Sequence, residues 1–303
     1  MFDLENIKVL HIEPTTVCNA ACPQCDRENA LLYDKNKPCE LSLNDIKKLV
    51  PKQLVRNLDK MFMCGNFGDP AAAKQCLEIY QYFKTENPNI TLGLNTNGGI
   101  KNVNWWENLA NVFTGMYDYV VFSIDGLEDT NHLYRKNVKW HKIIENAGAF
   151  IANGGVAHWD MLVYQHNQHQ VDNAEQLARE MGFSWFRAKV SKRFNTIPVE
   201  SLNPPDDWQL PNVANPDLIQ CHALQEQSMF LAANGEFLPC CFIGSRVFNK
   251  DIVLENALNT VNFQGVSNSW QKNPLSVCSN TCGVVEDSHS SFHNQWQREV
   301  QLC

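Results

Sequence analysis

Between residues 7 and 190 the sequence alternates strand-like and helix-like segments, and this alternation restricts the fold more than any other feature. Apolar segments rich in β-branched residues predict strands at 7–13, 60–64, 90–95, 118–124, 156–164 and 184–190. Amphipathic segments predict helices at 43–57, 71–87, 104–114, 139–153 and 170–182. Six strands alternating with helices imply a parallel sheet with right-handed crossovers, and they suit an incomplete β/α barrel better than a closed eight-stranded one.

Local signals support several helix boundaries within this pattern. Ser42 followed by Asp45 is typical of a capping box, and Pro70 suits the first turn of a helix. Gly154 and Gly182 follow directly after predicted helices, where glycine often ends a helix. The start and end signals therefore agree with the periodicity.

Three cysteines, Cys18, Cys22 and Cys25, follow the first predicted strand in the segment CNAACPQC. A structural zinc site is closed by four protein ligands, whereas this segment supplies three, and the next cysteine is Cys39. A metal centre in this loop would therefore have one position open. Polar or glycine-rich segments follow the next four strands: GNFGDP, NTNGG, SIDG and YQHN. Because such folds carry their chemistry at the carboxyl ends of the strands, we expect these segments to converge on one mouth.

Composition narrows the class of protein further. The chain has 303 residues and 44% hydrophobic residues, which suits a large core, and its net charge of −8 argues against a nucleic-acid or anionic-membrane surface. The first residues show no secretory signal, and no apolar run approaches the roughly 20 residues of a membrane helix. We expect a cytoplasmic protein whose twelve cysteines are reduced and serve metal binding or redox chemistry.

The cysteine spacing and the order of the strand-end segments resemble the radical S-adenosylmethionine (SAM) superfamily. The resemblance implies that Cys18, Cys22 and Cys25 bind a [4Fe–4S] cluster and that SAM occupies the open iron position. It also implies reductive cleavage of SAM to a 5′-deoxyadenosyl radical, which abstracts a hydrogen atom from the substrate. The electron would come from a reductant such as flavodoxin or ferredoxin.

The same resemblance implies a set of SAM-binding residues. The glycine-rich segment and the ends of the third and fourth strands supply them: Gly65, Asn66, Gly68, Asp69, Pro70, Asn95, Ser123 and Asp125. One position departs from the family pattern, because Gln24 stands where an aromatic residue is often found.

The sequence after residue 190 has a different character. Pro198, Pro204, Pro205, Pro211 and Pro216 predict an irregular linker over 191–220. Two strand-like runs then flank Asn234-Gly235, which is a strong hairpin signal. We therefore divide the chain into a barrel at 1–190 and a linker with a small hairpin-containing domain at 191–303.

Four cysteines in this C-terminal part resemble those of the SPASM and twitch extensions of radical SAM enzymes. The resemblance implies that an auxiliary [4Fe–4S] cluster is bound by Cys221, Cys240, Cys278 and Cys282. Cys241 is the second choice to Cys240, and structural zinc is the alternative to iron and sulfide.

Several polar residues near strand ends are candidates for proton transfer or substrate binding. Those expected to act on the substrate are Glu13, Gln165, His166, Arg187 and Lys189. Arg135 is either an anchor for a carboxylate or a solvated helix charge.

The favoured function is a two-electron oxidation of a small molecule, with the auxiliary cluster as electron acceptor. Because the first predicted strand begins within ten residues of Met1, we expect no leader-binding domain of the kind that many peptide-modifying relatives carry, which favours a small molecule. Oxidation, crosslinking or epimerisation of a peptide is the alternative within enzymes. An iron–sulfur electron-transfer or sensor protein and a zinc-stabilised binding protein are alternatives of other classes.

Overall fold

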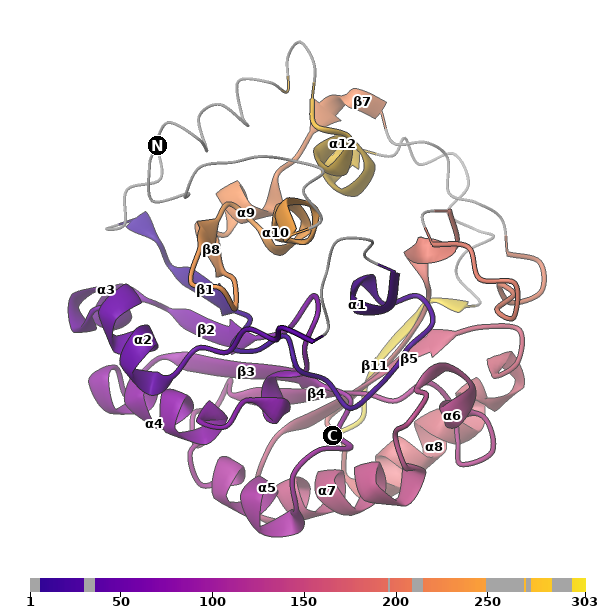
Figure 1. Ribbon diagram of the computed structural model, residues 1–303. Helices are drawn as coiled ribbons and strands as arrows, with labels where there is room; N and C mark the ends of the chain where they lie inside the picture. The colour runs from indigo at the N-terminus through magenta and orange to yellow at the C-terminus, as the bar shows by residue number, and fades with distance from the viewer. Residues whose placement is uncertain are drawn as a thin grey trace.

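The computed structural model describes residues 6–29, 36–195, 197–208, 215–248, 270, 274–284 and 296–303 (Figure 1). Six parallel strands form its centre: β1 (Val9–Ile12), β2 (Lys60–Met63), β3 (Thr91–Thr96), β4 (Tyr119–Ser123), β5 (Ala157–Val163) and β6 (Trp185–Val190). Each strand pairs in parallel with the next one along the chain. The sheet is not closed, so the predicted partial α/β barrel is confirmed.

The C-terminal part of the chain extends both edges of this sheet. Strand β8 (Ser228–Leu231) pairs in parallel with β1, and β9 (Phe237–Leu238) follows it in antiparallel orientation. Strand β11 (Arg298–Gln301) pairs antiparallel with β6. The complete order is β11-β6-β5-β4-β3-β2-β1-β8-β9. The predicted hairpin therefore exists and also continues the barrel sheet.

Helices cover the outer face of the parallel strands (Figure 1). They are α2 (Leu43–Leu49), α3 (Lys52–Asn57), α4 (Cys76–Glu86), α5 (Val103–Ala110), α7 (Trp140–Ala152) and α8 (Val171–Met181). The capping box of α2 is confirmed, because the Ser42 hydroxyl accepts from the Asp45 N–H and the Asp45 carboxylate accepts from the Ser42 N–H. Gly182 ends α8 in the left-handed conformation with φ 84°.

Two of the predicted helices differ in extent from the structure. The prediction of one helix over 43–57 is wrong, because Pro51 has no N–H to continue the hydrogen-bond ladder of α2 and instead precedes α3. The prediction of one helix over 71–87 is also wrong. A short 3₁₀ turn, η2 (Pro70–Ala72), comes first, and α4 begins only at Cys76.

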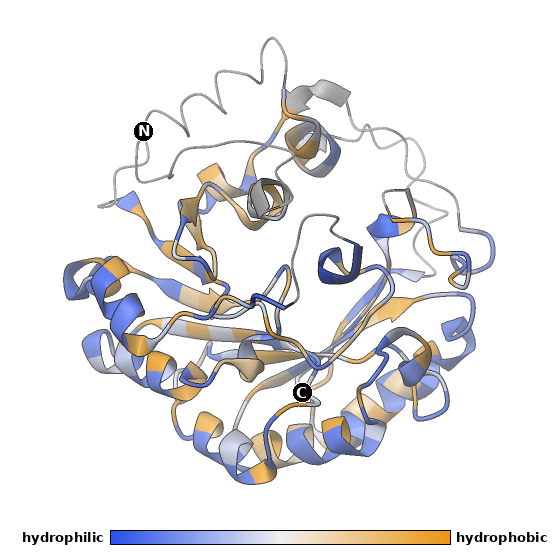
Figure 2. Ribbon diagram, in the orientation of Figure 1, coloured by the Kyte–Doolittle hydropathy of each residue, from blue (hydrophilic) through white to orange (hydrophobic). Residues whose placement is uncertain are grey.

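The main core lies between the sheet and these helices, where Figure 2 shows apolar residues on the helix faces that meet the sheet. Alternate strand residues such as Met61 and Leu94 point into it and are fully buried. Trp106, Phe122 and Phe150 pack there edge to face or tilted. The other residues of each strand face the open mouth of the barrel.

The remaining elements lie around this mouth (Figure 1). They are α1 (Asp26–Asn29), α6 (Asn131–Tyr134), η3 (Gln168–Gln170), η4 (Lys192–Asn195), β7 (Asn215–Ile219), α9 (His222–Gln225), α10 (Cys241–Phe248), α12 (Ser276–Cys282) and β10 (Gly283–Val284). Strand β7 pairs antiparallel with β10. The linker expected at 191–220 is thus partly regular. Pro216 lies in β7, which tolerates it because a two-stranded ladder leaves each strand one free edge. Pro211 lies outside the described residues.

None of the helices in the described ranges combines the length and the apolar character needed to cross a membrane.

Candidate active site

The loop with Cys18, Cys22 and Cys25 begins at the carboxyl end of β1, at the mouth of the barrel. Each of its thiols contacts a group from a different part of the mouth. The contacts are Asn97 Nδ2 to Cys18 Sγ at 3.7 Å, Arg135 Nη1 to Cys22 Sγ at 3.8 Å and Cys25 Sγ to Asn66 O at 3.9 Å. Two of the predicted strand-end segments, GNFGDP and NTNGG, therefore meet the cysteine loop.

Burial and the nearby guanidinium groups shift the pKa of these thiols in opposite directions. Burial raises the pKa of Cys18 to about 12 and that of Cys22 to about 11. The Arg135 guanidinium partly lowers the pKa of Cys22, and Arg193 does the same for Cys25, whose pKa burial raises. Guanidinium groups favour thiolates, and thiolates are the ligands of iron–sulfur clusters. Three sulfurs with two cationic neighbours fit such a cluster.

The glycine-rich segment is shaped from beneath by Glu13. The Oε1 atom of Glu13 accepts from the N–H groups of Phe67 at 2.7 Å and Gly68 at 3.1 Å. Burial raises the pKa of Glu13 to about 7, and its Oε2 atom has no hydrogen-bond partner among the described residues. A Cβ atom on Gly68 would lie 1.9 Å from the carbonyl oxygen of Thr15. Glycine is needed there because two backbone segments touch.

Asp69 joins this segment to two other loops. Its buried carboxylate accepts from the Thr96 hydroxyl at 2.9 Å and from the Asn97 N–H at 2.7 Å. Its own N–H donates to the carbonyl of Val17 at 2.9 Å, next to the first cysteine. Asn97 then donates from Nδ2 to Asn19 Oδ1 at 2.8 Å. The predicted SAM-binding Asp69 thus fixes the positions of the loops.

Asn19 and Asn97 were not predicted as site residues. The recurrence of short amides directly after Cys18 and after the third strand is the sequence signal that could have indicated them. Asn95 and Ser123, which were predicted, are half-buried residues of β3 and β4 and stay predictions as SAM contacts.

Asp125 and Arg135 form a buried ion pair below Cys22. Arg135 Nε lies 2.6 Å from Asp125 Oδ2, and the Leu162 N–H donates to Oδ1 at 2.6 Å. The side chain of Arg135 is only 16% exposed, so the alternative of a solvated charge is wrong. The carboxylate of Asp125 holds the guanidinium against the cysteine.

Gln24 anchors the far end of the cysteine loop. It is fully buried, and its Oε1 accepts from the Ser191 hydroxyl at 2.8 Å and the Tyr164 hydroxyl at 3.3 Å. Arg193 donates to the Gln24 carbonyl at 3.0 Å and pairs with Asp26 at 3.6 Å. The residue that departs from the family pattern therefore ties the loop to the end of β6. Arg193 is a further site residue that the sequence did not indicate.

The remaining predicted catalytic residues fall into two groups. Arg187 Nε donates to Asp160 Oδ1 at 3.0 Å, and Lys189 Nζ donates to Asp160 Oδ2 at 2.9 Å. These three residues share the inner face of β5 and β6, because Asp160 is paired in register with Arg187 and Lys189 lies two residues further on. The structure therefore brings Arg187 and Lys189 together at one carboxylate.

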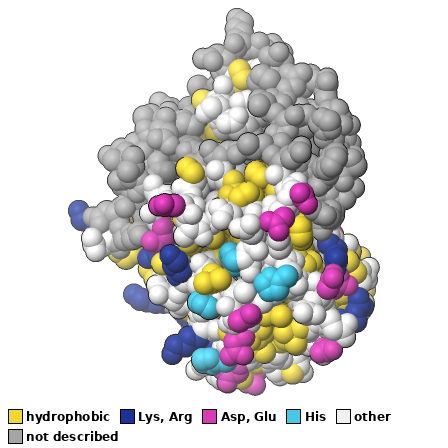
Figure 3. Space-filling model, turned by 90° about the vertical axis from the view of Figure 1, so that its right-hand side faces the viewer, with side chains coloured by type: hydrophobic (Ala, Val, Ile, Leu, Met, Phe, Trp, Pro, Cys, Tyr) yellow, Lys and Arg dark blue, Asp and Glu magenta, His cyan; other side chains and the backbone are white. Residues whose placement is uncertain are grey.

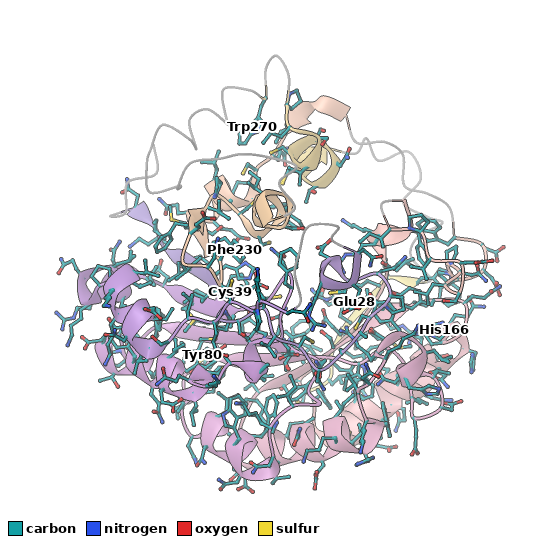
Figure 4. The ribbon with its side chains drawn as sticks, viewed as in Figure 1. Glu28, Cys39, Tyr80, His166, Phe230 and Trp270 are labelled. Atoms are coloured by element: carbon teal, nitrogen blue, oxygen red, sulfur yellow. The ribbon has the colours of Figure 1, made fainter. Side chains whose placement is uncertain are left out.

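Gln165 and His166 lie elsewhere, beyond the end of β5. Gln165 is exposed and donates to Asp206 at 3.0 Å, and the His166 ring stacks on Tyr164 at 5.4 Å. Figure 4 places His166 near α6 and α8, and Figure 3 shows histidines gathered with acidic residues on this side of the molecule. Burial, and then the nearby His132 and His169, lower the pKa of His166. Neither side chain has a described direct contact with the cysteine loop, and His166 reaches it only through Tyr164, which donates to Gln24.

The four C-terminal cysteines line one apolar pocket. Pairing of β7 with β10 places the first and last of them together, because Gln220 N–H donates to the Cys282 carbonyl at 2.9 Å. Cys278 and Cys282 are four residues apart on α12 and share one face of that helix. Cys221 and Cys240 directly precede the helices α9 and α10. Trp270, drawn beside α12 in Figure 4, packs against the hydrophobic cluster formed by Ile243 and Cys278.

Asn66 lies between the cysteine loop and the start of α10. Asn66 donates from Nδ2 to the carbonyl oxygen of Cys241 at 2.7 Å, while its own carbonyl contacts Cys25. Cys241 lines a neighbouring pocket instead of the one lined by the four cysteines. Among the described residues, no three His, Cys, Asp or Glu side chains are close enough to hold a single metal ion.

Comparisons with known proteins agree with this geometry. The family model described as the radical SAM superfamily matches residues 12–178, more than half of the chain. The structure is similar to that of SuiB from Streptococcus suis bound to its precursor peptide SuiA, with a TM-score of 0.60 and 16% identity. That match covers 89% of this chain and 65% of SuiB, so the chain spans less than two thirds of that relative.

A second similar structure is BtrN in complex with AdoMet, which is SAM, and 2-DOIA. Its TM-score is 0.54 and its identity 11%, and the match covers 96% of this chain and 98% of BtrN. A comparison with curated protein sequences gave no match. At these identities the structural matches establish the fold.

Proposed function

This chain belongs to the radical SAM superfamily, and from that premise we propose that it is an oxidoreductase that carries out a two-electron oxidation of a small molecule. The family implies a [4Fe–4S] cluster and SAM. Together these groups supply, when bound, the 5′-deoxyadenosyl radical that removes a hydrogen atom from the substrate. The observation that carries the oxidation is the second cysteine set beside the barrel mouth.

In this proposal the barrel loop holds the first cluster through Cys18, Cys22 and Cys25 and leaves one iron to SAM. The glycine-rich segment at 65–70 would bind SAM through its backbone, with Asn95 and Ser123 as further contacts. Asp125 acts through Arg135, which it holds against Cys22. A reductant such as flavodoxin or ferredoxin would supply the electron.

We further propose that Cys221, Cys240, Cys278 and Cys282 bind an auxiliary [4Fe–4S] cluster. Their common pocket supports this assignment. Four protein ligands would leave no iron for the substrate, which favours electron acceptance over substrate binding. Residues 1–190 then form the radical SAM part and 191–303 the linker and the twitch-like part, although β8 lies within the barrel sheet.

The inner face of β5 and β6 offers polar groups to the substrate. Arg187 and Lys189 have side chains that are 39% and 42% exposed, and Asp160 holds both. Glu299 on β11 is paired in register with Arg187. The carboxylates of Asp160 and Glu299 together balance the charges of Arg187 and Lys189. A polar, uncharged or zwitterionic substrate suits this balanced set better than a strongly anionic one.

Metal analysis tests the two clusters. Anaerobically reconstituted protein should contain about eight irons and eight sulfides as two cubane clusters. The triple variant Cys18→Ser, Cys22→Ser, Cys25→Ser should keep about half and lose SAM cleavage under dithionite. Stoichiometric zinc without absorbance near 400 nm would contradict both assignments.

Replacing the other set tests the role of the auxiliary cluster. The variant Cys221→Ser, Cys278→Ser, Cys282→Ser should still cleave SAM but should form no oxidised product. Circular dichroism must show that it is folded, because loss of a metal centre can unfold its surroundings. Normal product formation by a folded variant would exclude the electron-acceptor role.

Peptide modification is a second candidate function. It is favoured by the similarity to SuiB, which was solved with its precursor peptide bound. The substrate distinguishes the two candidates. If SAM cleavage were accompanied by a change in the mass of a peptide, peptide modification would be favoured.

A further inference from the structure

A second pocket lies between the inner face of β1 and β2 and the C-terminal elements. We call it the His11 pocket. His11 and Phe62 come from the barrel strands, Phe230 from β8, and Cys241 and Phe242 from α10. Phe230, labelled in Figure 4, lies where β8 meets the barrel. Apart from a few polar groups, the lining is apolar and aromatic.

The tautomer of His11 follows from its one hydrogen bond. His11 Nε2 lies 2.6 Å from the carbonyl oxygen of Cys64. A carbonyl oxygen only accepts, so Nε2 carries the hydrogen. Burial lowers the pKa of His11 to about 4, which keeps the ring neutral at pH 7. The other nitrogen, Nδ1, is therefore an unprotonated acceptor.

Nδ1 is available to a ligand. No described residue donates a hydrogen bond to it, and it is not among the fully buried polar atoms that lack a partner. His11 keeps 8% of its surface accessible and lines the pocket. The open acceptor of a buried ring therefore faces this pocket.

The ring of His11 is held rigidly. It stacks on Phe62 with a centroid distance of 4.3 Å and meets the edge of Phe230 at 4.8 Å. The bond to Cys64, the stacking on Phe62 and the contact with Phe230 together hold the ring in one orientation. Such fixed orientation makes Nδ1 a directional group, which suits recognition of one donor.

The His11 pocket also adjoins both cysteine sets. Cys64 immediately precedes the glycine-rich segment, and His11 lies two residues before Glu13, which holds that segment. On the opposite side, Cys221, Cys240 and Cys282 line both this pocket and the pocket of the four cysteines. A group bound here would therefore lie directly beside the proposed auxiliary site.

We propose that the His11 pocket binds an apolar part of the substrate that carries a hydroxyl or amino group, with His11 Nδ1 accepting its hydrogen. This inference rests on the proposed function in one respect, which is that the ligand of the pocket is the enzyme's substrate. A neutral acceptor in an apolar surrounding selects a donor and excludes a carboxylate, which would bring a second acceptor and an unpaired charge. The substrate class is thus an alcohol or amine with a hydrophobic body.

The test uses phenol and its methyl ether, anisole, as probes on the full chain labelled with ¹⁵N-histidine. The two probes have similar apolar bodies, but only phenol donates a hydrogen bond. Phenol should move the His11 Nδ1 resonance upfield in a saturable manner and bind at least about fivefold more tightly than anisole. Equal affinities, or a phenol response confined to other histidines, would overturn the proposal.

Variants provide the control. His11→Phe keeps the packing against Phe62 and Phe230 and should remove the preference for phenol, while His141→Gln, an exposed position on α7, should keep it. If His11→Phe does not fold, the resonance shift in the unaltered protein decides alone. SAM cleavage is measured separately: cleavage without a phenol response contradicts the pocket, and a phenol response without cleavage contradicts the proposed function.

Discussion

Cys18, Cys22 and Cys25 contact groups from distant loops, whereas Cys221, Cys240, Cys278 and Cys282 are placed by strand pairing and helix starts. The first set contacts Asn97 after β3, Asn66 after β2 and Arg135 at the end of α6. The second depends on the pairing of β7 with β10 and on helices α9, α10 and α12. The barrel set should therefore depend mainly on the side chains that contact it, and the C-terminal set mainly on the backbone pairing of β7 with β10 and on its helices.

The electrostatic surroundings of the two sets differ as well. Guanidinium groups of Arg135 and Arg193 lower the pKa of Cys22 and Cys25 against the effect of burial. For Cys221 and Cys240, burial raises the pKa and backbone N–H groups at the starts of α9 and α10 oppose it. One set relies on full charges and the other on backbone dipoles.

The largest effect is expected at Gly68, where the cysteine loop rests on the glycine-rich segment. Gly68→Ala places Cβ 1.9 Å from the backbone oxygen of Thr15, and neither backbone can swing away. We expect a loss of about 4 kcal/mol or more in urea unfolding, together with loss of iron from the barrel site only. Gly148→Ala in α7, where a Cβ meets nothing within 4 Å, should be neutral or stabilising. Equal behaviour of the two variants would contradict this view of the loop.

Removing the charge below Cys22 should have the next largest effect. Arg135→Gln leaves Asp125 buried without its partner and should cost about 3 to 4 kcal/mol. It should also reduce iron retention at the barrel site. Lys84→Gln is the matched control, because the Lys84–Asp118 pair is 16% and 1% exposed, against 16% and 0% for Arg135–Asp125. Lys84→Gln should lower the free energy of unfolding without changing the iron content. If both variants lost iron, the iron content would depend on overall stability and not on the charge of Arg135.

Because of Glu13, the free energy of unfolding should fall as the pH rises. Its folded pKa is about 7 and its ordinary value 4.5, so the folded chain binds this proton more tightly. Between pH 4.5 and pH 8 the native protein should lose about 3 kcal/mol relative to Glu13→Gln, measured by urea unfolding of both chains. Glu86→Gln should show the opposite sign, because Lys52 and Arg56 hold the pKa of Glu86 below its usual value. A flat difference for Glu13→Gln would show that this carboxyl is ionised in the folded protein.

The smallest effect is expected at Asn66, whose side chain joins the glycine-rich segment to the start of α10. Asn66→Ala removes the 2.7 Å bond to the Cys241 carbonyl and should cost about 1 kcal/mol. Its spectroscopic effect should extend to both clusters, seen as changes in their two electron paramagnetic resonance signals. Asn153→Ala, which removes an exposed bond within α7, should alter neither signal. A change confined to one cluster would mean that Asn66 does not couple the sites.

The sequence predicted the order of the parallel strands because each strand and helix carries its own periodicity. It also indicated the capping box at Ser42 and the hairpin turn at Asn234-Gly235, which are local signals. It did not indicate the pairings of β8 with β1 or of β11 with β6, since strand partners far apart in sequence leave no local pattern.

The site shows the same limit at the level of single side chains. The cysteine spacing is visible in the sequence, but the inward direction of Gln24 and the contact of Arg193 with the loop depend on the folded barrel. Asp125 was expected to face SAM because of its residue type, whereas its oxygens are used by Arg135 and the Leu162 N–H. Residue type indicates possible chemistry, and only the fold decides which partner each group meets.

The parallel pairing of β8 with β1 bears on how the chain is made. The free edge of β1 receives its partner only when residues 228–231 arrive, more than 200 residues after β1 itself. Until then a nascent barrel exposes an unpaired strand next to the cysteine loop, and such edges attract other chains. Synthesis on the ribosome therefore passes through a stage at which β1 and the cysteine loop exist without β8. Chaperone binding or slow metal delivery at that stage would protect the free edge of β1 and the cysteine loop.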